Sequence, residues 1–334
     1  RNNKYRRQLQ TPTGTVPQSH QSRQPPGNIF SKMGVSDDVV QPKQAEAVVQ
    51  DTIIHLETTK DCLKPAKIGF VGSGNMAQAL LNGFVNKGLV EASNVWASAP
   101  SDRNLAKLKP LGVHTTHDNG LVIQECDIVF LSVKPHLFIE VNAGLSPIEG
   151  DHKPLFISIM TGISIEKLEQ MLSGIVQNPR VVRTMPNTPC MVSQGCCVYC
   201  LGSNATDADG IIVKTMLSSV ALCEQVPESQ LDGICGLAGS GPAYIYAVIE
   251  ALADGGVKMG IPRQLAQSMA AQMVKGAATM VLESGKHPGQ LKDEVCSPGG
   301  TTITAMHKLE TGGLRGTLMS AVEASAQRSK ELGK

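Results

Sequence analysis

The sequence predicts an α/β fold in which an N-terminal, doubly wound and largely parallel sheet is followed by a C-terminal domain of helices alone. Apolar runs that are continuous rather than alternating recur between residues 67 and 201, as expected for strands covered by helices on both faces. Beyond residue 228 almost every segment is helix-forming and rich in small residues. The predicted parts are an N-terminal extension (1–64), a sheet domain (65–228) and a helical domain (229–334).

Strands and helices are expected to alternate in the sheet domain. Residues Lys67 to Val71 form a strand, and Met76 to Lys87 continue as a helix that Gly88 ends. A short helix is expected around Leu105. Further strands are predicted at Asn94 to Ser98, Asp127 to Val133, Leu155 to Ile159, Arg180 to Thr184 and Cys196 to Leu201. Helices of the second domain are predicted at Ala243 to Leu252, Gln264 to Leu282, Thr302 to Leu309 and Leu318 to Leu332.

Composition limits the kinds of partner and compartment. A net charge of +1 gives no reason to expect nucleic acid or an anionic membrane as the main partner. No apolar run reaches the roughly 18 residues that a membrane span requires. Nine cysteines, an odd number, without a recognisable secretory signal favour a reducing compartment over a disulfide framework.

Cys197 and Cys200 form a C-x-x-C pattern, which occurs in zinc sites and in redox pairs. The pattern lies in a predicted strand, where residues three apart point to opposite faces. A zinc site would also need two further ligands at suitable spacing. We therefore expect buried strand cysteines and no metal site.

The N-terminal extension, residues 1–64, is rich in Gln, Pro, Ser and Thr and is expected to be disordered. Six basic residues, Arg1, Lys4, Arg6, Arg7, Arg23 and Lys32, precede the first acid, Asp37, as in a mitochondrial transit peptide. Alternatively, Met33 is the initiator, and the remaining tail then carries several acids. We predict a cytoplasmic location, with the mitochondrion as the alternative.

A glycine motif follows the first strand. Gly72 permits a tight turn, Gly74 lets the backbone approach a pyrophosphate, and Ala77 leaves room for helix to pack on strand. The N–H groups at the helix start, around Asn75 and Met76, then face the anion. An ordinary glycine-rich loop is the alternative. The strand–turn–helix context predicts a Rossmann-type dinucleotide site.

The end of the second strand indicates which dinucleotide binds. Where NAD-binding proteins usually carry an acid for the ribose diol, this chain has Ser98. A carboxylate there would repel a 2′-phosphate, whereas serines with Arg103 can hold one by charge-assisted hydrogen bonds. NADPH is therefore the expected cofactor, with NADH as a second one. The alternative makes Asp102 and Arg103 a solvated helix start.

Loops after later strands should lie at the same carboxyl edge of the sheet, where ligands bind in this architecture. The loop that carries Met160 and Thr161 is expected near the nicotinamide. Alternatively, Lys134 is a surface lysine with only a structural role, and residues 183–189 form a turn with only a structural role. The candidates for cofactor binding in these loops are Val133, Lys134, Pro135, Met160 and Thr161.

A second glycine cluster spans residues 297–302 and leads into a helix. Consecutive N–H groups at a helix start make a site for a carboxylate, and the Ser and Thr hydroxyls add donors. As a bare helix cap, the same residues would need no function. Two anion-binding loops, one in each domain, suggest a dinucleotide and an anionic substrate that meet between them.

Seven motifs in order resemble the pyrroline-5-carboxylate reductase family, from about Lys67 to Leu332. They are GSGNMA (72–77), VKP (133–135), MPNTP (185–189), GSGPA (239–243), DGGV (254–257), HPGQL (287–291) and SPGGTT (297–302). The resemblance implies an NAD(P)H-dependent oxidoreductase that delivers hydride to the C=N carbon of L-1-pyrroline-5-carboxylate, giving L-proline in the last step of proline biosynthesis.

The resemblance also implies an architecture and site residues. The family has a Rossmann domain and a helical dimerisation domain, whose homodimers often assemble into a decamer. Asn119, Lys134 and Pro135 would line the cofactor site. The substrate carboxylate and ring nitrogen would be held by Ser297, Gly300, Thr301 and Thr302, with Thr302 as the catalytic hydroxyl.

Two other classes of protein stay open. A dehydrogenase of hydroxy acids would need a catalytic Lys or His on the first long helix, yet residues 237–252 offer only Tyr244, Tyr246 and Glu250. A catalytically silent NADPH-binding protein is the other, and the intact loop at 297–302 argues against it.

Overall fold

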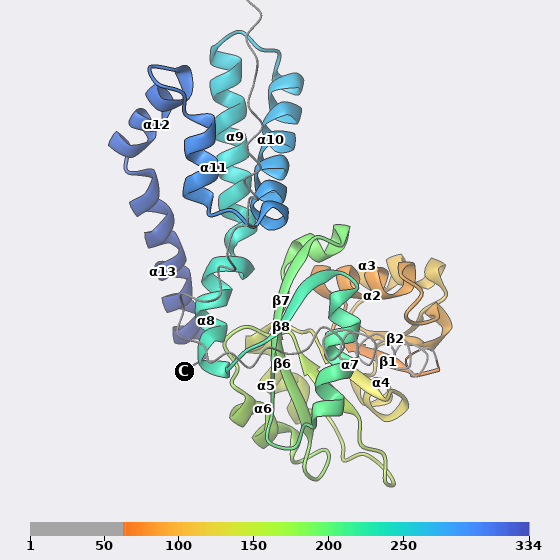
Figure 1. The fold of residues 1–334 in the computed structure, drawn as a ribbon. Helices are drawn as coiled ribbons and strands as arrows, with labels where there is room; N and C mark the ends of the chain where they lie inside the picture. Colours follow the sequence, from red (N-terminus) through yellow and green to blue (C-terminus); the bar gives the residue numbers. More distant parts are fainter. Residues whose placement is uncertain (1–62, 64, 334) are drawn as a thin grey trace, which may run out of the picture. The chain divides into compact units, whose positions relative to one another are not determined.

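The computed structural model describes residue 63 and residues 65–333 (Figure 1). The disorder and the basic targeting segment predicted for residues 1–64 therefore fall almost entirely outside the described residues.

A single eight-stranded sheet has the order β3-β2-β1-β4-β5-β6-β7-β8. Neighbouring strands are parallel except β6 and β7, whose short connection is too brief for the crossover that a parallel pair needs. The strands are β1 (Ile68–Val71), β2 (Val95–Ser98), β3 (His114–Thr116), β4 (Ile128–Leu131), β5 (Leu155–Ser158), β6 (Arg180–Met185), β7 (Gly195–Leu201) and β8 (Ala221–Gln225).

This arrangement confirms the predicted, largely parallel sheet. Two strands, β3 and β8, were not predicted. Both are edge strands with few buried residues, so neither carries the apolar run that marked the central strands.

Helices cover both faces of the sheet, as a doubly wound fold requires. One buried cluster joins the sheet to α2 and α7, through residues such as Phe84 and Met216. The other joins it to α4, α5 and α6, through residues such as Phe138 and Leu168. These helices are α2 (Asn75–Asn86), α3 (Asp102–Leu108), α4 (Asn119–Glu125), α5 (Pro135–Ala143), α6 (Ile165–Leu172) and α7 (Asp207–Ser218), with short 3-10 turns η2 (Ala92–Asn94), η3 (Lys109–Leu111) and η4 (Thr188–Val192).

Three phenylalanines stack at the centre of the first cluster. The rings of Phe70 on β1 and Phe130 on β4 lie 4.8 Å apart and nearly parallel, and Phe84 of α2 lies 5.7 Å from Phe130. All three side chains are almost fully buried. The strand β1, and the turn that follows it, are thus anchored in a buried aromatic cluster of the sheet domain.

The chain after the sheet is helical throughout its described length. The predicted helices are found, most of them longer than expected. The elements are η5 (Glu228–Gln230), α8 (Leu231–Ile234), a π-helical turn η6 (Cys235–Gly239), α9 (Gly241–Lys258), α10 (Arg263–Ser284), α11 (Pro288–Val295), α12 (Thr301–Thr311) and α13 (Leu314–Leu332).

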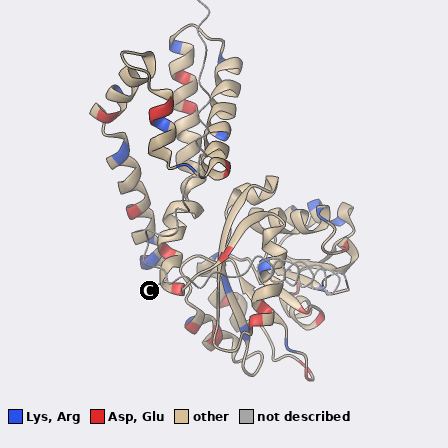
Figure 2. Cartoon of the chain, viewed as in Figure 1, with Lys and Arg blue, Asp and Glu red and all other residues tan. Residues whose placement is uncertain are grey.

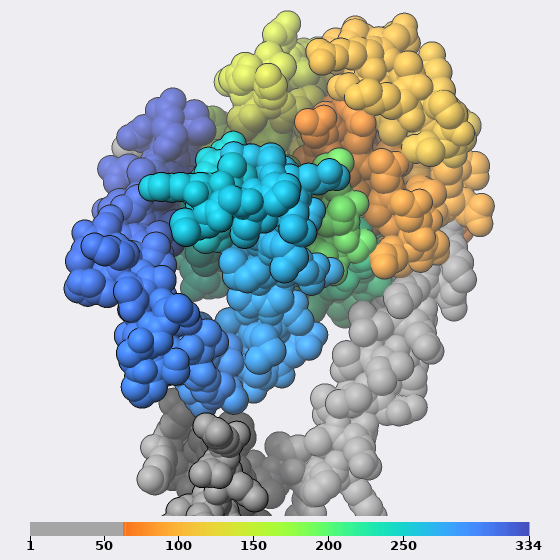
Figure 3. Space-filling view, turned by 90° about the horizontal axis from the view of Figure 1, so that it is seen from above, coloured from red at the N-terminus to blue at the C-terminus, as the bar shows by residue number. Residues whose placement is uncertain are grey.

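This helical region has little core of its own. Where α9 packs on α10, the buried cluster consists of Ala253, Ala266 and Ala270. Large apolar side chains remain exposed on the same helices, among them Met259, Met269 and Leu282. Figure 3 shows α9 and α10 next to each other on the same face of the molecule. Several large apolar side chains exposed on neighbouring helices are typical of protein–protein interfaces.

Figure 2 shows acidic and basic residues distributed along the described helices and strands. None of the helices in residues 65–333 combines the length and the apolar character needed to cross a bilayer.

Candidate functional site

The turn after β1 has the geometry of a phosphate-binding loop. Gly72 has a φ of +96°, and a Cβ added there would lie 2.9 Å from the backbone carbonyl of Ser132. Any side chain would therefore strain the turn. Gly74 is the N-cap of α2 and provides no side-chain cap, so the first N–H groups of α2 have no side-chain acceptor. This helix start can bind an anion.

A cavity of about 660 Å³ opens at this turn. It brings together the three predicted cofactor loops, which lie at the carboxyl ends of β1, β4 and β5 as the parallel topology requires. From these loops the lining residues include Gly74, Asn75, Met76, Val133, Lys134, Pro135, Met160 and Thr161.

The opposite wall of the cavity comes from the helical region. Its lining residues were not found from the sequence, because they lie far along the chain and carry no local motif for a ligand. Of these residues, only Ser240 lies in one of the family motifs, GSGPA (239–243). These residues are Cys235, Ser240, Ser325, Arg328, Ser329 and Leu332.

The structure does not leave the Ser98 hydroxyl free to contact a phosphate, contrary to the prediction. The residue is fully buried, and its Oγ donates to Asn119 Oδ1 at 2.7 Å, with the Phe70 carbonyl at 3.3 Å. Its own carbonyl accepts from Ser73 Oγ at 2.8 Å. The hydroxyl is thus engaged inside the protein, where it orients the half-buried Asn119.

The β2–α3 loop carries charged groups outside this buried network. The Asp102 carboxylate lies 3.5 Å from Lys109 Nζ and 3.8 Å from His117 Nε2. His117 also contacts the Ala99 carbonyl through Nδ1 at 2.8 Å. The neighbouring Arg103 is exposed and has no ion pair within the described residues. Asp102 is therefore met by basic groups, whereas Arg103 is available to an anion.

His117 was missed in the sequence because it follows β3, an edge strand that the sequence does not reveal. No residue type or spacing around it signals a position beside the loop of β2.

The cysteine pair of the C-x-x-C pattern points to opposite faces of β7. Cys197 belongs to one buried cluster and Cys200 to another, as predicted. Burial raises the pKa of the Cys200 thiol to about 12 and raises that of Cys197 well above its usual range. Cys196, in contrast, is exposed, which corrects the expectation that all the cysteines of this strand are buried.

The second glycine cluster forms a tight turn before α12. Gly299 has a φ of +66°, and the Gly300 N–H donates to the Ser297 carbonyl at 3.0 Å. Gly300 caps α12 without a side-chain hydrogen bond, so the first N–H groups of this helix are open to an anion. Ser297 and Thr301 are exposed, and Thr302 is half-buried.

The structure does not bring this turn to the cavity of its own chain. None of Ser297, Gly300, Thr301 and Thr302 lines the cavity. The cavity is instead bounded by the C-terminal end of α13, a helix of 19 residues that is about 28 Å long and follows α12 in the chain.

The chain is similar to known proteins over most of its described residues. Residues 67–162 match the family described as NADP oxidoreductase, coenzyme F420-dependent, and residues 228–332 match the pyrroline-5-carboxylate reductase dimerisation family. Pyrroline-5-carboxylate reductase 3 of Bos taurus is 44% identical over 269 residues, which cover 80% of this chain and 86% of that protein. This chain belongs to the pyrroline-5-carboxylate reductase family.

Other relatives agree. The pyrroline-5-carboxylate reductase of Glycine max is 46% identical over 268 residues, covering 79% of this reductase and 95% of its own length. The crystal structure of Plasmodium falciparum pyrroline carboxylate reductase with NADP bound superposes with a TM-score of 0.74 at 34% identity, covering 81% of this chain and all of that one. The family resemblance and the fold class inferred from the sequence are thereby confirmed.

The burial of the two thiols makes a prediction about their reactivity. Because the thiolate is the nucleophile and both pKa values are raised, Cys197 and Cys200 should resist alkylation of the native reductase at pH 8 and react only after unfolding. Peptide mass spectrometry after iodoacetamide treatment measures this, with the exposed Cys196 as the internal control. Labelling of Cys200 at the rate of Cys196 would contradict the assignment.

Proposed function

We propose that this protein reduces the C=N bond of L-1-pyrroline-5-carboxylate with NADPH and releases L-proline. The observation that carries the proposal is the cavity bounded by the Gly72–Met76 turn and the helical region, in a chain that is 43–46% identical to pyrroline-5-carboxylate reductases over about four-fifths of its length. The assay that tests it is oxidation of NADPH with pyrroline-5-carboxylate as substrate and proline as the measured product.

The residues of the first loop fit a dinucleotide phosphate. The space beside Gly72 cannot hold a side chain, and the uncapped start of α2 offers N–H donors to an anion. Lys134, whose ammonium has no ion pair within the described residues, adds a positive charge at the same edge. When bound, NADPH supplies the hydride. Met160 and Thr161 would line the nicotinamide side of the cavity.

We assign the 2′-phosphate to Arg103, with Asn119 at the ribose. The exposed guanidinium can donate to the phosphate, and Lys109 offsets the charge of Asp102 beside it. Ser98 supports Asn119 rather than touching the ligand. NADH lacks the phosphate and would lose only this contact, so it remains the second cofactor of the proposal.

We infer that the turn before α12 serves the cavity of a second copy of the chain. The turn does not line its own cavity, and the exposed apolar faces of α9 and α10 need a partner. In such a site, the open N–H groups of α12, with Ser297 and Thr301, would hold the substrate carboxylate.

The chemistry requires little from the side chains beyond position and one proton donor. A protonated cyclic imine is already electrophilic, and holding two reactants in register can lower the barrier by roughly 7–11 kcal/mol. The Thr302 hydroxyl would hydrogen-bond the ring nitrogen and help to deliver its proton. No strong acid or base is needed in this assignment.

The match to a dimerisation family indicates an oligomer. We propose a homodimer as the unit that completes the site, with a decamer as a larger assembly. For location we keep the cytoplasm as the prediction and the mitochondrion as the alternative, since the segment that separates them lies in residues 1–62.

Arg103→Ala should selectively weaken NADPH binding. The dissociation constant of NADPH should rise roughly 5- to 13-fold, between the values for an exposed ion pair and for a hydrogen bond to a charged group. That of NADH should change less than about twofold. Fluorescence titration measures both constants, and Lys107→Ala, one turn further along α3, is the matched control. An equal loss for the two cofactors would count against a 2′-phosphate contact.

Thr302→Ala should lower kcat as well as kcat/KM, because a bond that strengthens in the transition state affects turnover. One lost neutral hydrogen bond predicts a decrease of about 2- to 13-fold. NADPH affinity should be unchanged. Steady-state kinetics and the melting temperature are measured together, with Thr311→Ala at the other end of α12 as the control. A destabilised variant with unchanged kcat/KM would show that Thr302 is only a helix residue.

A mixed dimer tests whether two chains share one site. Gly72→Ala disables the nucleotide turn, and Gly300→Asp places a carboxylate in the substrate turn. If the turns of different chains meet, a heterodimer of the two variants has one intact site and recovers about half of the wild-type activity. Two affinity tags isolate the heterodimer, and light scattering gives its size. Without recovery, both turns belong to one chain.

A further inference from the structure

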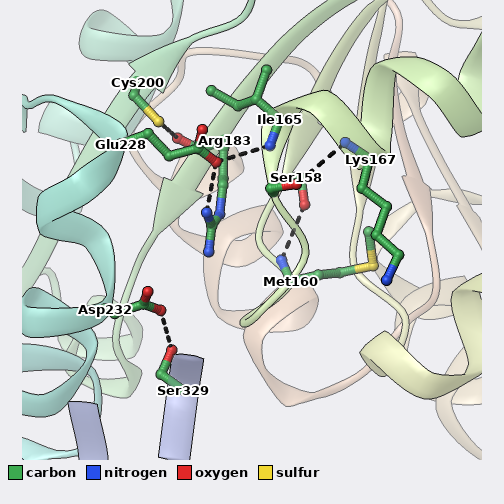
Figure 4. A network of polar contacts seen from close by, with 10 residues as sticks. Ser158, Met160, Ile165, Lys167, Arg183, Cys200, Glu228, Asp232 and Ser329 are labelled. Carbon is green, nitrogen blue, oxygen red and sulfur yellow. Dashed lines mark hydrogen bonds and ion pairs between the residues drawn. The ribbon is translucent and has the colours of Figure 1, made fainter. Parts of the chain in front are cut away.

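The segment that leads from the cavity into α6 ends on an ion pair between the buried Arg183 and the partly exposed Glu228 (Figure 4). Glu228 Oε1 accepts a hydrogen bond from Arg183 Nη1 at 2.7 Å and another from the backbone N–H of Ile165 at 2.8 Å. Ile165 is the first residue of α6, and Glu228 opens η5, where the match to the dimerisation family begins. One carboxylate oxygen therefore joins β6, α6 and the start of the helical region.

Arg183 places a charged guanidinium in a largely buried position at this junction. Its side chain is 6% exposed, and Glu228 is its ion-pair partner among the described residues. Its Nε has no hydrogen-bond partner in the part of the chain that the structure describes. The nearby buried cluster is apolar and includes Met185, Cys200 and Leu231. An ion pair with one partner this buried contributes little net stability, whereas the loss of Glu228 leaves an unpaired buried charge on Arg183. Its presence is better explained by a requirement for position.

The same segment is held at its other end and in its middle. The Ser158 carbonyl accepts from Thr184 Oγ1 at 3.0 Å, and Ser158 Oγ accepts from the Met160 N–H at 3.3 Å. Gly162, with a φ of +83°, packs against the backbone of Leu332 and Gly333 at the end of α13. Residues 159–164 thus run between fixed points.

We propose that Glu228 and Arg183 are positioning residues for the cofactor. By holding the first N–H of α6, the Glu228 carboxylate sets the path of residues 159–164 and hence the place of Met160 and Thr161 in the cavity wall. Arg183 holds that carboxylate in register. The inference rests on the proposed function, which assigns Met160 and Thr161 to the nicotinamide side.

Two uncharged double variants isolate this role. The amide variant, Arg183→Met with Glu228→Gln, removes both charges but keeps an amide oxygen that can accept from the Ile165 N–H. The thioether variant, Arg183→Met with Glu228→Met, removes the charges and the acceptor. Neither leaves an unpaired buried charge, so the two differ mainly in the one hydrogen bond. Glu166→Gln is the matched control, since this exposed carboxylate on the first turn of α6 has no hydrogen bond or ion pair in residues 65–333.

The measurements are the dissociation constant of NADPH and hydrogen exchange of the peptide covering residues 159–168. We expect NADPH to bind about 2- to 13-fold more weakly to the thioether variant than to the amide variant, the range for one neutral hydrogen bond. Exchange should accelerate in this peptide alone. At saturating NADPH, kcat should also be lower for the thioether variant than for the amide variant, because a displaced nicotinamide is out of register with the imine. Equal affinities and equal exchange would overturn the proposal whatever the melting temperatures.

A single variant keeps the test decisive if the thioether variant does not fold. Glu228→Asp preserves the charge beside Arg183 but withdraws the carboxylate from Ile165 by one methylene, and NADPH affinity should again fall. An unchanged affinity would overturn the role of Glu228. The failure of the proposed function is a separate result: a wild-type protein that binds NADPH but leaves pyrroline-5-carboxylate unreduced refutes the substrate, whereas the two double variants report on cofactor placement directly.

Discussion

The close approach of the turn after β1 to the end of β4 is the constraint on which the site depends. Gly72 lies so near the Ser132 carbonyl that no side chain fits, and Ser132 Oγ donates back to the Gly72 carbonyl at 2.7 Å. The stacked rings of Phe70 and Phe130 anchor the two strands behind this contact. Because the turn is held from both sides, the start of α2 and the loop after β4 face one cavity with little freedom to move apart.

The helical region depends on a different balance. Its own core is built from alanines, and its larger apolar side chains face outward. Burying these side chains stabilises the protein by about 25 cal/mol per Å² of apolar surface, and this happens only when another surface covers them. The dimerisation match agrees with this arrangement. Assembly would then stabilise the helices and bring an anion-binding turn to the cavity, so stability and completion of the site would have one cause.

Two groups of charged side chains bear on the cavity and its supports. The Asp102 carboxylate after β2 lies near Lys109 and His117, which leaves Arg103 open to an anion. The buried Arg183 is neutralised by Glu228, which also binds a backbone N–H of α6. Elsewhere the signs are interspersed. The net charge is only +1, so a field that attracts an anion would have to come from helix starts and from cations such as Arg103 and Lys134, which have no ion pair among the described residues.

Local sequence determined the elements whose signals are local. The apolar runs predicted the central strands, the glycine spacing predicted the turn at Gly72, and the ordered motifs identified the family. It did not reveal the edge strands β3 and β8, which bury few residues, or the cavity wall of Ser325, Arg328 and Ser329. The buried state of Ser98 also depended on Asn119, a residue 21 positions away. Tertiary structure decided these features because they are set by contacts between distant segments, for which a single sequence carries no periodic pattern.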